Sequence, residues 1–276
     1  MNDRYSQFKE YCIQNTPWLE KQGLPLTYLK KEKETVLIEF RKLPHINFIL
    51  RNTIRVLDSS WSHTIICGNK NYDFIKEIVD RINRKIRVIK LEKDNLTRME
   101  YSIMLLTSDF YKQFTGKYLL IYQEDTIIFK DIPNKYFFYD FVGAPLPNND
   151  KCFNGGFSLR NKDKMIKICE TIFDRKKIKF QAAKNFLEEK IGYLYSKGID
   201  YKKNKKLKFL YKIEESLLED LLLCQNCNNL PDFKTAKDFS VEKYYTEHPI
   251  GGHQFWYSLK NVGLWLEVNL KKIGYY

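Results

Sequence analysis

The sequence predicts an α/β fold with a mixed, mainly parallel central sheet flanked by helices. Short apolar runs alternate with longer segments of helical periodicity, and this β-α-β-α-β order favours parallel strands joined by right-handed crossovers. The 276 residues, of which 43% are hydrophobic and 29% charged, can bury a large core and exclude a wholly disordered chain. No linker rich in Gly, Ser or Pro divides the chain, so we expect a single domain spanning residues 1–276.

The expected elements follow one another in the order of a nucleotide-binding α/β fold. A helical lead-in at residues 1–34 precedes a first strand at 35–40 and a helix that begins near Pro44, a residue suited to a first helical turn. Further strands are expected at residues 62–68, 85–91 and 116–125, and further helices at 71–83, 97–114, from about 162 onward, and 213–227. The fourth strand carries an unbroken apolar run, which is consistent with burial on both of its faces.

The net charge of +13 is concentrated in one segment, residues 174–212. This segment holds thirteen Lys or Arg against four Asp or Glu, an excess of nine that leaves +4 for the rest of the chain. Its apolar residues recur at helical spacing, which predicts a basic helical insertion. Two interpretations stay open. In the first, the lysines reflect only the amino-acid bias of an AT-rich genome and have no function. In the second, the insertion binds an acceptor substrate or an anionic surface.

The six cysteines are scattered except for Cys224 and Cys227, and no second CxxC or paired histidines complete a zinc site. We therefore expect free, structural thiols. The N-terminus lacks the apolar core of a secretory signal, and no apolar run approaches the ~20 residues of a membrane-spanning helix. These observations predict a cytoplasmic protein.

Clustered polar groups mark the candidate site. Glu124 and Asp125 follow the fourth strand, at the carboxyl edge where open α/β sheets bind their ligands. The remaining groups are the turn Asn154-Gly155-Gly156, the pair Glu219-Asp220, and His253. Each group alone also has an ordinary structural interpretation, as a solvated turn, an exposed helix face or a core histidine. Their order along the chain favours a functional one.

Taken together, VLIEFR, YQEDTII, FVGAPLP followed by FNGGFSLR, LLEDLLLC and GGHQFW resemble the GT-A-fold glycosyltransferase-like domains of giant viruses and bacteria. The resemblance extends from about Thr35 to Trp256, and it implies a GT-A-like, Rossmann-related sheet. Gln123-Glu124-Asp125 occupies the place of the family's DxD-like motif, with Gln in the first position where the family has Asp. The turn at 154–156 matches its NGG motif, Glu219-Asp220 its ED motif, and His253 its late histidine.

The resemblance implies roles for these residues in transfer from a UDP- or GDP-linked sugar. Asp125 and His253 would hold a divalent cation, Mn²⁺ or Mg²⁺, at the donor diphosphate, and the mixed carboxylate and imidazole ligands favour Mn²⁺. Asp220 would be the base of an inverting reaction, with Glu219 orienting the acceptor. The donor-binding residues would be Gln123, Glu124, Asp125, Asn154, Gly155 and Gly156, together with Glu39 and Arg41 at the end of the first strand.

The acceptor would be a hydroxyl of a glycan, a protein or a lipid-linked molecule, and the basic segment 174–212 would serve that acceptor or an anionic surface. Two rival functions remain. A sugar-binding relic without turnover is compatible with Gln123. A nucleic-acid-binding protein would explain the positive charge and the 15% aromatic residues, but it leaves the acidic pairs unexplained, and the sequence shows no nucleic-acid-binding motif.

Overall fold

The computed structural model describes residues 2–147, 149–173, 185–186, 189–194, 196–199, 218–259, 261–271 and 274. The basic insertion expected at residues 174–212 lies mostly outside these residues. Within the described part, none of the helices has the length and apolar character needed to cross a bilayer.

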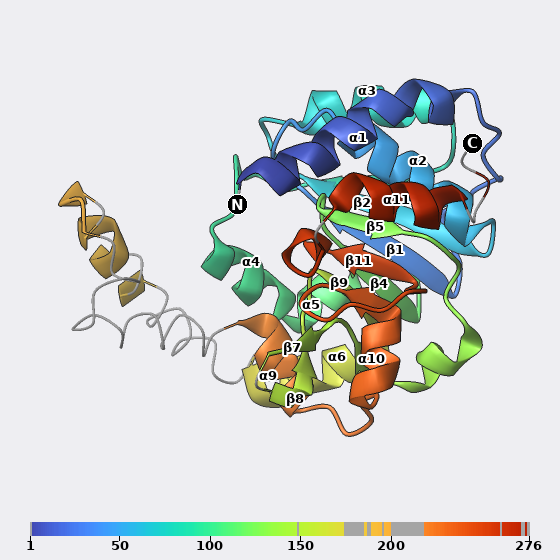
Figure 1. Ribbon diagram of the computed structural model, residues 1–276. Helices are drawn as coiled ribbons and strands as arrows, with labels where there is room; N and C mark the ends of the chain where they lie inside the picture. Colours follow the sequence, from blue (N-terminus) through green and yellow to red (C-terminus); the bar gives the residue numbers. More distant parts are fainter. Residues whose placement is uncertain are drawn as a thin grey trace.

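The main sheet contains six strands in the order β3-β2-β1-β4-β9-β6 (Figure 1). All of its pairings are parallel except those of β9, which runs antiparallel to β4 and β6. The strands are β1 (Lys33–Ile38), β2 (Trp61–Cys67), β3 (Arg87–Lys90), β4 (Tyr118–Tyr122), β6 (Phe141–Val142) and β9 (Phe157–Asn161). The mixed, mainly parallel sheet predicted from the sequence is therefore confirmed.

Two smaller sheets extend the fold. One contains three strands in the order β10-β11-β5, and the other pairs β7 with β8. Their bounds are β5 (Thr126–Ile128), β7 (Pro145–Leu146), β8 (Asn149–Phe153), β10 (Ser240–Val241) and β11 (Gly251–His253). β11 pairs antiparallel with β5, and β5 follows β4 after a short turn. The strand Gly251–His253 is therefore brought back to the carboxyl edge of the main sheet.

Helices cover both faces of the main sheet (Figure 1). One face is covered by α1 (Asn2–Glu20), α2 (Ile46–Leu57), α3 (Tyr72–Ile82) and α11 (Val262–Lys271). The other is covered by α4 (Arg98–Leu105), α5 (Ser108–Lys112), α6 (Lys162–Ile168) and α9 (Glu219–Gln225), while α10 (Phe233–Phe239) contacts β7, β8 and β10. Side chains of each strand alternate between the two cores: Leu37 faces the first, whereas Val36 and Ile38 face the second. The sheet is thus buried on both faces.

The helix expected over residues 97–114 is divided in two. α4 ends at Leu105, and α5 begins at Ser108 after Thr107, whose backbone is extended. The Oγ1 atom of Thr107 donates a hydrogen bond to the carbonyl of Met104 at 2.8 Å. A hydroxyl that bonds the nearby backbone in this way competes with continued helix, which explains why the apolar periodicity did not reveal the break.

The cysteines agree with the sequence-based expectation. All six carry free thiols, and five of them are buried. Cys224 lies within α9 and bonds to the neighbouring strand, because its Sγ atom accepts from the backbone N–H of Phe153 at 3.4 Å. Cys224 therefore contributes to packing between α9 and β8.

Candidate active site

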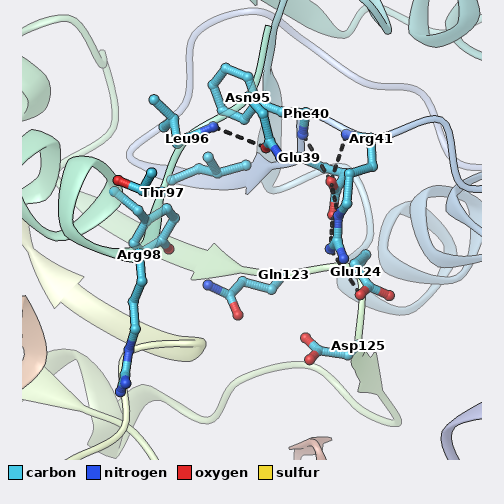
Figure 2. Close-up of a pocket in the computed structure, with 12 residues that line it drawn as sticks. Glu39, Phe40, Arg41, Asn95, Leu96, Thr97, Arg98, Gln123, Glu124 and Asp125 are labelled. Atoms are coloured by element: carbon cyan, nitrogen blue, oxygen red, sulfur yellow. Dashed lines mark hydrogen bonds and ion pairs between the residues drawn. The ribbon is translucent and has the colours of Figure 1, made fainter. Parts of the chain in front are cut away.

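A pocket of about 290 Å³ opens at the carboxyl edge of the main sheet, beside the ends of β1 and β4. β1 has β2 on one side and β4 on the other, so the strand order changes direction here, and such switch points are where open α/β sheets bind ligands. Figure 2 shows the three segments that line it: Ile38–Arg41 after β1, Gln123–Asp125 after β4, and Asn95–Arg98 with Tyr101 at the start of α4.

Arg41 is held between two buried carboxylates (Figure 2). Its Nε and Nη2 atoms donate to Glu39 at 2.8 and 2.7 Å, and Nη2 also donates to Glu124 at 3.0 Å. The Oε1 atom of Glu39 accepts in addition from the backbone N–H groups of Phe40 and Arg41, which fixes the turn after β1. Although the side chain of Arg41 is 51% exposed, its positive charge is already matched by these carboxylates.

Glu124 has a partner for each of its oxygens. Oε1 accepts from the hydroxyl of Tyr5 at 2.6 Å as well as from Arg41, and Oε2 meets Nε2 of His45 at 2.6 Å. Burial, together with the hydrogen bond to Glu124, raises the pKa of Tyr5, so its phenol keeps the proton that it donates. Glu124 thus ties α1, the turn after β1 and the start of α2 to the end of β4.

Asp125 and His253 face each other, with Oδ1 of Asp125 3.3 Å from Nε2 of His253. The Nδ1 atom of His253 lies 3.4 Å from Glu242, and Gln254 donates to the other oxygen of Asp125 at 2.9 Å. Burial opposes protonation of His253, but the carboxylates of Asp125 and Glu242 outweigh it and raise the pKa of the imidazole to about 10. Burial likewise opposes ionisation of Asp125, and the imidazole overcomes it and lowers the pKa of Asp125.

Asp125 offers a carboxylate oxygen to a cation, and His253 would offer an imidazole nitrogen once it has lost its proton. Oδ1 of Asp125 is buried and accepts no well-aligned hydrogen bond in the described part of the chain, and Oε1 of Gln123 lies 3.3 Å from the same imidazole nitrogen. Glu242 contacts Nδ1 of His253, the ring nitrogen that faces away from Asp125. Metal-bound histidines commonly donate this second ring N–H to a carboxylate. The described residues contain no group of three or more His, Cys, Asp or Glu that could hold a metal ion.

The Asn154–Gly156 turn separates two groups of charged side chains. A Cβ atom on Gly156 would lie 2.3 Å from Nε2 of His253, and one on Gly155 would lie 2.5 Å from Oε1 of Glu219. The Oδ1 atom of Asn154 accepts from the backbone N–H of Gly156 at 2.7 Å and holds the turn. Both glycines are thus required because side chains of the site pack directly against the backbone.

Glu219 is buried against Arg160, which is itself fully buried. The Nη2 atom of Arg160 lies 3.2 Å from Glu219, and Nη1 donates to the hydroxyl of Tyr111 at 3.0 Å. Ser102 of α4 donates to the second oxygen of Glu219 at 3.3 Å. Glu219 therefore neutralises a buried arginine, and it connects α9 with β9 and α4.

Asp220 is half-buried and has no cationic partner of its own among the ion pairs of the described residues. Its oxygens accept from the backbone N–H groups of Gly155 at 3.2 Å and Leu221 at 2.8 Å. Burial and the neighbouring charge of Glu219 raise its pKa to about 7, although these two hydrogen bonds favour the ionised form. A carboxylate with such a pKa can accept a proton near neutral pH.

The structure brings the predicted site residues to one edge of the sheet in two groups. Glu39, Arg41, Gln123, Glu124 and Asp125 line the pocket, and Asn154, Gly155, Gly156, Glu219, Asp220 and His253 meet at the turn beside it. Five further residues at this edge were not predicted from the sequence: Tyr5, His45, Arg98, Arg160 and Glu242. A charged residue inside the apolar strand FSLR could have indicated that Arg160 is buried with an acidic partner. The other four carry no comparable signal in the sequence.

Comparison with the curated proteins finds no match. Among solved structures, the chain is similar to the mannosyltransferase PcManGT from Pyrobaculum calidifontis, in complex with GDP-Man and Mn²⁺, at a TM-score of 0.37 and 10% sequence identity. That match covers 59% of this chain and 55% of the mannosyltransferase, so the chain spans about half the length of its structural neighbour.

A family model described as "Protein of unknown function (DUF5672)" matches residues 85–253. This range is more than half of the 276 residues, and it runs from the third strand of the sheet to His253 in the site. The chain therefore belongs to the DUF5672 family.

Proposed function

We propose that this chain is a glycosyltransferase that moves a sugar from a UDP- or GDP-linked donor to an acceptor hydroxyl with inversion at the sugar carbon. The observation that carries the proposal is the shared Asn154–Gly156 turn, which has Asp125 and His253 on one side and Asp220 on the other. The sequence resemblance supports it, because each of its motifs contributes to this edge of the sheet.

The proposed reaction needs a cation at the departing diphosphate and a base at the acceptor hydroxyl. When bound between Asp125 and His253, Mn²⁺ or Mg²⁺ would neutralise the charge that develops on the departing diphosphate. Asp220 would remove the proton of the acceptor hydroxyl as its oxygen attacks the sugar carbon and the bond to the phosphate oxygen breaks. Glu219, paired with Arg160, would hold Asp220 in place at the start of α9. The acceptor would be a glycan, a protein or a lipid-linked molecule.

The proposal is tested by measuring the melting temperature with UDP, GDP and their sugars, with and without Mn²⁺, because a ligand that binds only the folded state raises apparent stability. Release of the nucleotide from the stabilising sugar then reports turnover. Asp125→Asn should weaken metal-supported binding, whereas Asp73→Asn, at an exposed aspartate in the first turn of α3, is the matched control.

The results separate the candidate functions. Binding with no turnover in any acceptor mixture would favour a sugar-binding relic. Absence of any nucleotide effect, together with salt-sensitive retention on nucleic acid, would favour the nucleic-acid-binding function and contradict the proposal. Unchanged metal dependence in Asp125→Asn would contradict the assignment of Asp125 as a ligand.

A further inference from the structure

We propose that Arg98 binds the diphosphate of the nucleotide donor from the α4 side of the pocket, opposite the carboxylate edge. This inference rests on the proposed function, because it concerns where a nucleotide lies in the same pocket. Arg98 is the first residue of α4, it is exposed, and it lines the pocket together with the ends of β1 and β4.

The charges that line the pocket indicate Arg98 as the side chain available to bind a diphosphate. The pocket is lined by three carboxylates, Glu39, Glu124 and Asp125, and by two arginines, Arg41 and Arg98. A diphosphate carries several negative charges and would be repelled by these carboxylates unless cations lie between them. Arg41 is already shared by two of the carboxylates. Arg98 forms no ion pair in the part of the chain that the structure describes, so its full charge is available to a ligand.

The start of α4 holds Arg98 at a fixed place. The Oγ1 atom of Thr97 accepts from the backbone N–H of Glu100 at 3.2 Å, and the Glu100 side chain accepts from the backbone N–H of Thr97 at 2.9 Å. This capping box occupies backbone N–H groups at the start of the helix. Lys93, which precedes the helix, forms an ion pair with Glu100. The helix end is thus stabilised from within, and the guanidinium is the group that remains free to contact a ligand.

Arg98 lies apart from the paired carboxylates of the pocket (Figure 2). Figure 2 shows Arg98 extending from the start of α4 and away from the Glu39–Arg41 pair, with Gln123 lying between it and Asp125. A diphosphate bound over Gln123 would meet positive charge from both sides: the cation on the β4 side, and a planar guanidinium that can donate two parallel hydrogen bonds on the α4 side. The nucleoside would then occupy the end formed by Phe40, Asn95 and Leu96.

Calorimetric titration of UDP, GDP, uridine and guanosine in the presence of Mn²⁺ tests the assignment. Arg98→Ala should weaken binding of the diphosphate by about 10- to 100-fold, the usual effect of losing a charge-assisted hydrogen bond, and leave binding of the nucleoside unchanged. Arg98→Lys should recover part of the loss, because it restores the charge without the planar fork. Arg81→Ala removes an exposed charge on α3 outside the pocket and is the matched control.

Each contrary result has a distinct meaning. If neither UDP nor GDP binds the wild-type protein, the proposed function and the role of Arg98 both fail. If the diphosphate binds wild type and Arg98→Ala equally, only the role of Arg98 fails. Equal losses for nucleoside and diphosphate would also overturn it, since Arg98 would then shape the pocket without contacting phosphate. Because Arg98 is exposed, we expect an unchanged melting temperature in the variant.

Discussion

Glu219 and Asp220 are consecutive acids whose surroundings in the fold differ. Glu219 is buried against an arginine that neutralises it, whereas Asp220 depends on two backbone N–H groups and feels the charge of its neighbour. Successive helical residues diverge by about 100°, so the two side chains point in different directions from the first turn of α9. The pair therefore divides into one structural acid and one that can exchange a proton.

We predict that Asp220→Asn binds nucleotide sugar normally and transfers the sugar about 10²- to 10⁴-fold more slowly, as expected for the loss of a general base. In the wild type, transfer should rise as pH increases through about 7, because the carboxyl becomes a base only when it loses its proton. Transfer rates measured between pH 5 and 9 check both expectations. A variant with wild-type rates would exclude Asp220 as the base.

The same raised pKa affects stability. The folded state favours the protonated carboxyl, so the contribution of Asp220 is fully present below its ordinary pKa and is lost as pH rises through about 7. Asp220→Asn should therefore gain stability relative to wild type at pH 8 and lose that advantage near pH 4. Urea unfolding at the two pH values measures the difference, and a gain that does not change with pH would contradict the shift.

We predict a different result for Glu219→Gln. This change leaves the buried guanidinium of Arg160 without its countercharge, and removing one partner of a buried ion pair typically costs about 3–5 kcal/mol. Denaturant unfolding at pH 7 provides the measurement, with Glu77→Gln on the exposed surface of α3 as the control. A loss no larger than that of the control would show that Arg160 does not depend on Glu219.

At the scale of elements, the fold agrees with the sequence mainly in the first half of the chain, whereas β9 and α11, of five and ten residues, were not predicted. Most strands and helices up to β4 were predicted because a short apolar run, or several turns of helix, identifies each one, although one expected helix is divided into α4 and α5. The three-stranded sheet could not be predicted, since β10 and β11 have two and three residues and their pairing depends on contacts between distant segments.

The site follows the same rule. Glu39 and Asp125 were predicted because they follow strands, and parallel strands deliver their ends to one edge of a sheet. Tyr5 and Glu242 could not be predicted, because they reach the site only through the packing of α1 and β10 around it. A sequence thus indicates which residues stand at strand ends, while the residues that hold them come from tertiary packing.

α1 is the element through which the start of the chain reaches the site. Tyr5→Phe removes one hydrogen bond to Glu124 and leaves Arg41 as the donor to the same oxygen. Because Glu124 and Arg41 line the pocket, we predict that nucleotide binding weakens about 10-fold, within the range of a lost bond to a charged acceptor. Calorimetric titration measures the change, and Tyr28→Phe, at a half-exposed tyrosine outside this pocket, is the control. Equal affinities in the two variants would contradict a positioning role.

At the scale of the whole molecule, the first and last helices, α1 and α11, pack together on one face of the sheet. α1 packs against α2 and α11, and Arg4 donates to the backbone carbonyls of Trp256 and Leu259 at 3.1 and 2.8 Å. Phe8 is fully buried and contacts the rings of Phe255 and Trp256. Neither α1 nor α11 lies in the range that matches the family model, yet both complete the core beneath the site.

We therefore predict that Phe8→Ala lowers the free energy of unfolding by about 3–5 kcal/mol, as expected for truncating a buried aromatic side chain. Ile13→Ala on the same helix should cost less than about 1 kcal/mol, because Ile13 is 44% exposed. Urea unfolding followed by tryptophan fluorescence compares the two variants. Similar losses would show that α1 is not part of the cooperative core.

The Asn154–Gly156 turn also limits how this sequence can diverge. Its two glycines meet His253 on one side and Glu219 on the other, so a larger residue at either position displaces a side chain about a hundred or sixty residues further along the chain. Replacing Gly156 by a larger residue requires a smaller residue in place of His253. Replacing Gly155 likewise requires a smaller residue in place of Glu219. Each glycine is therefore coupled to its own distant partner, so neither position of the turn can change alone.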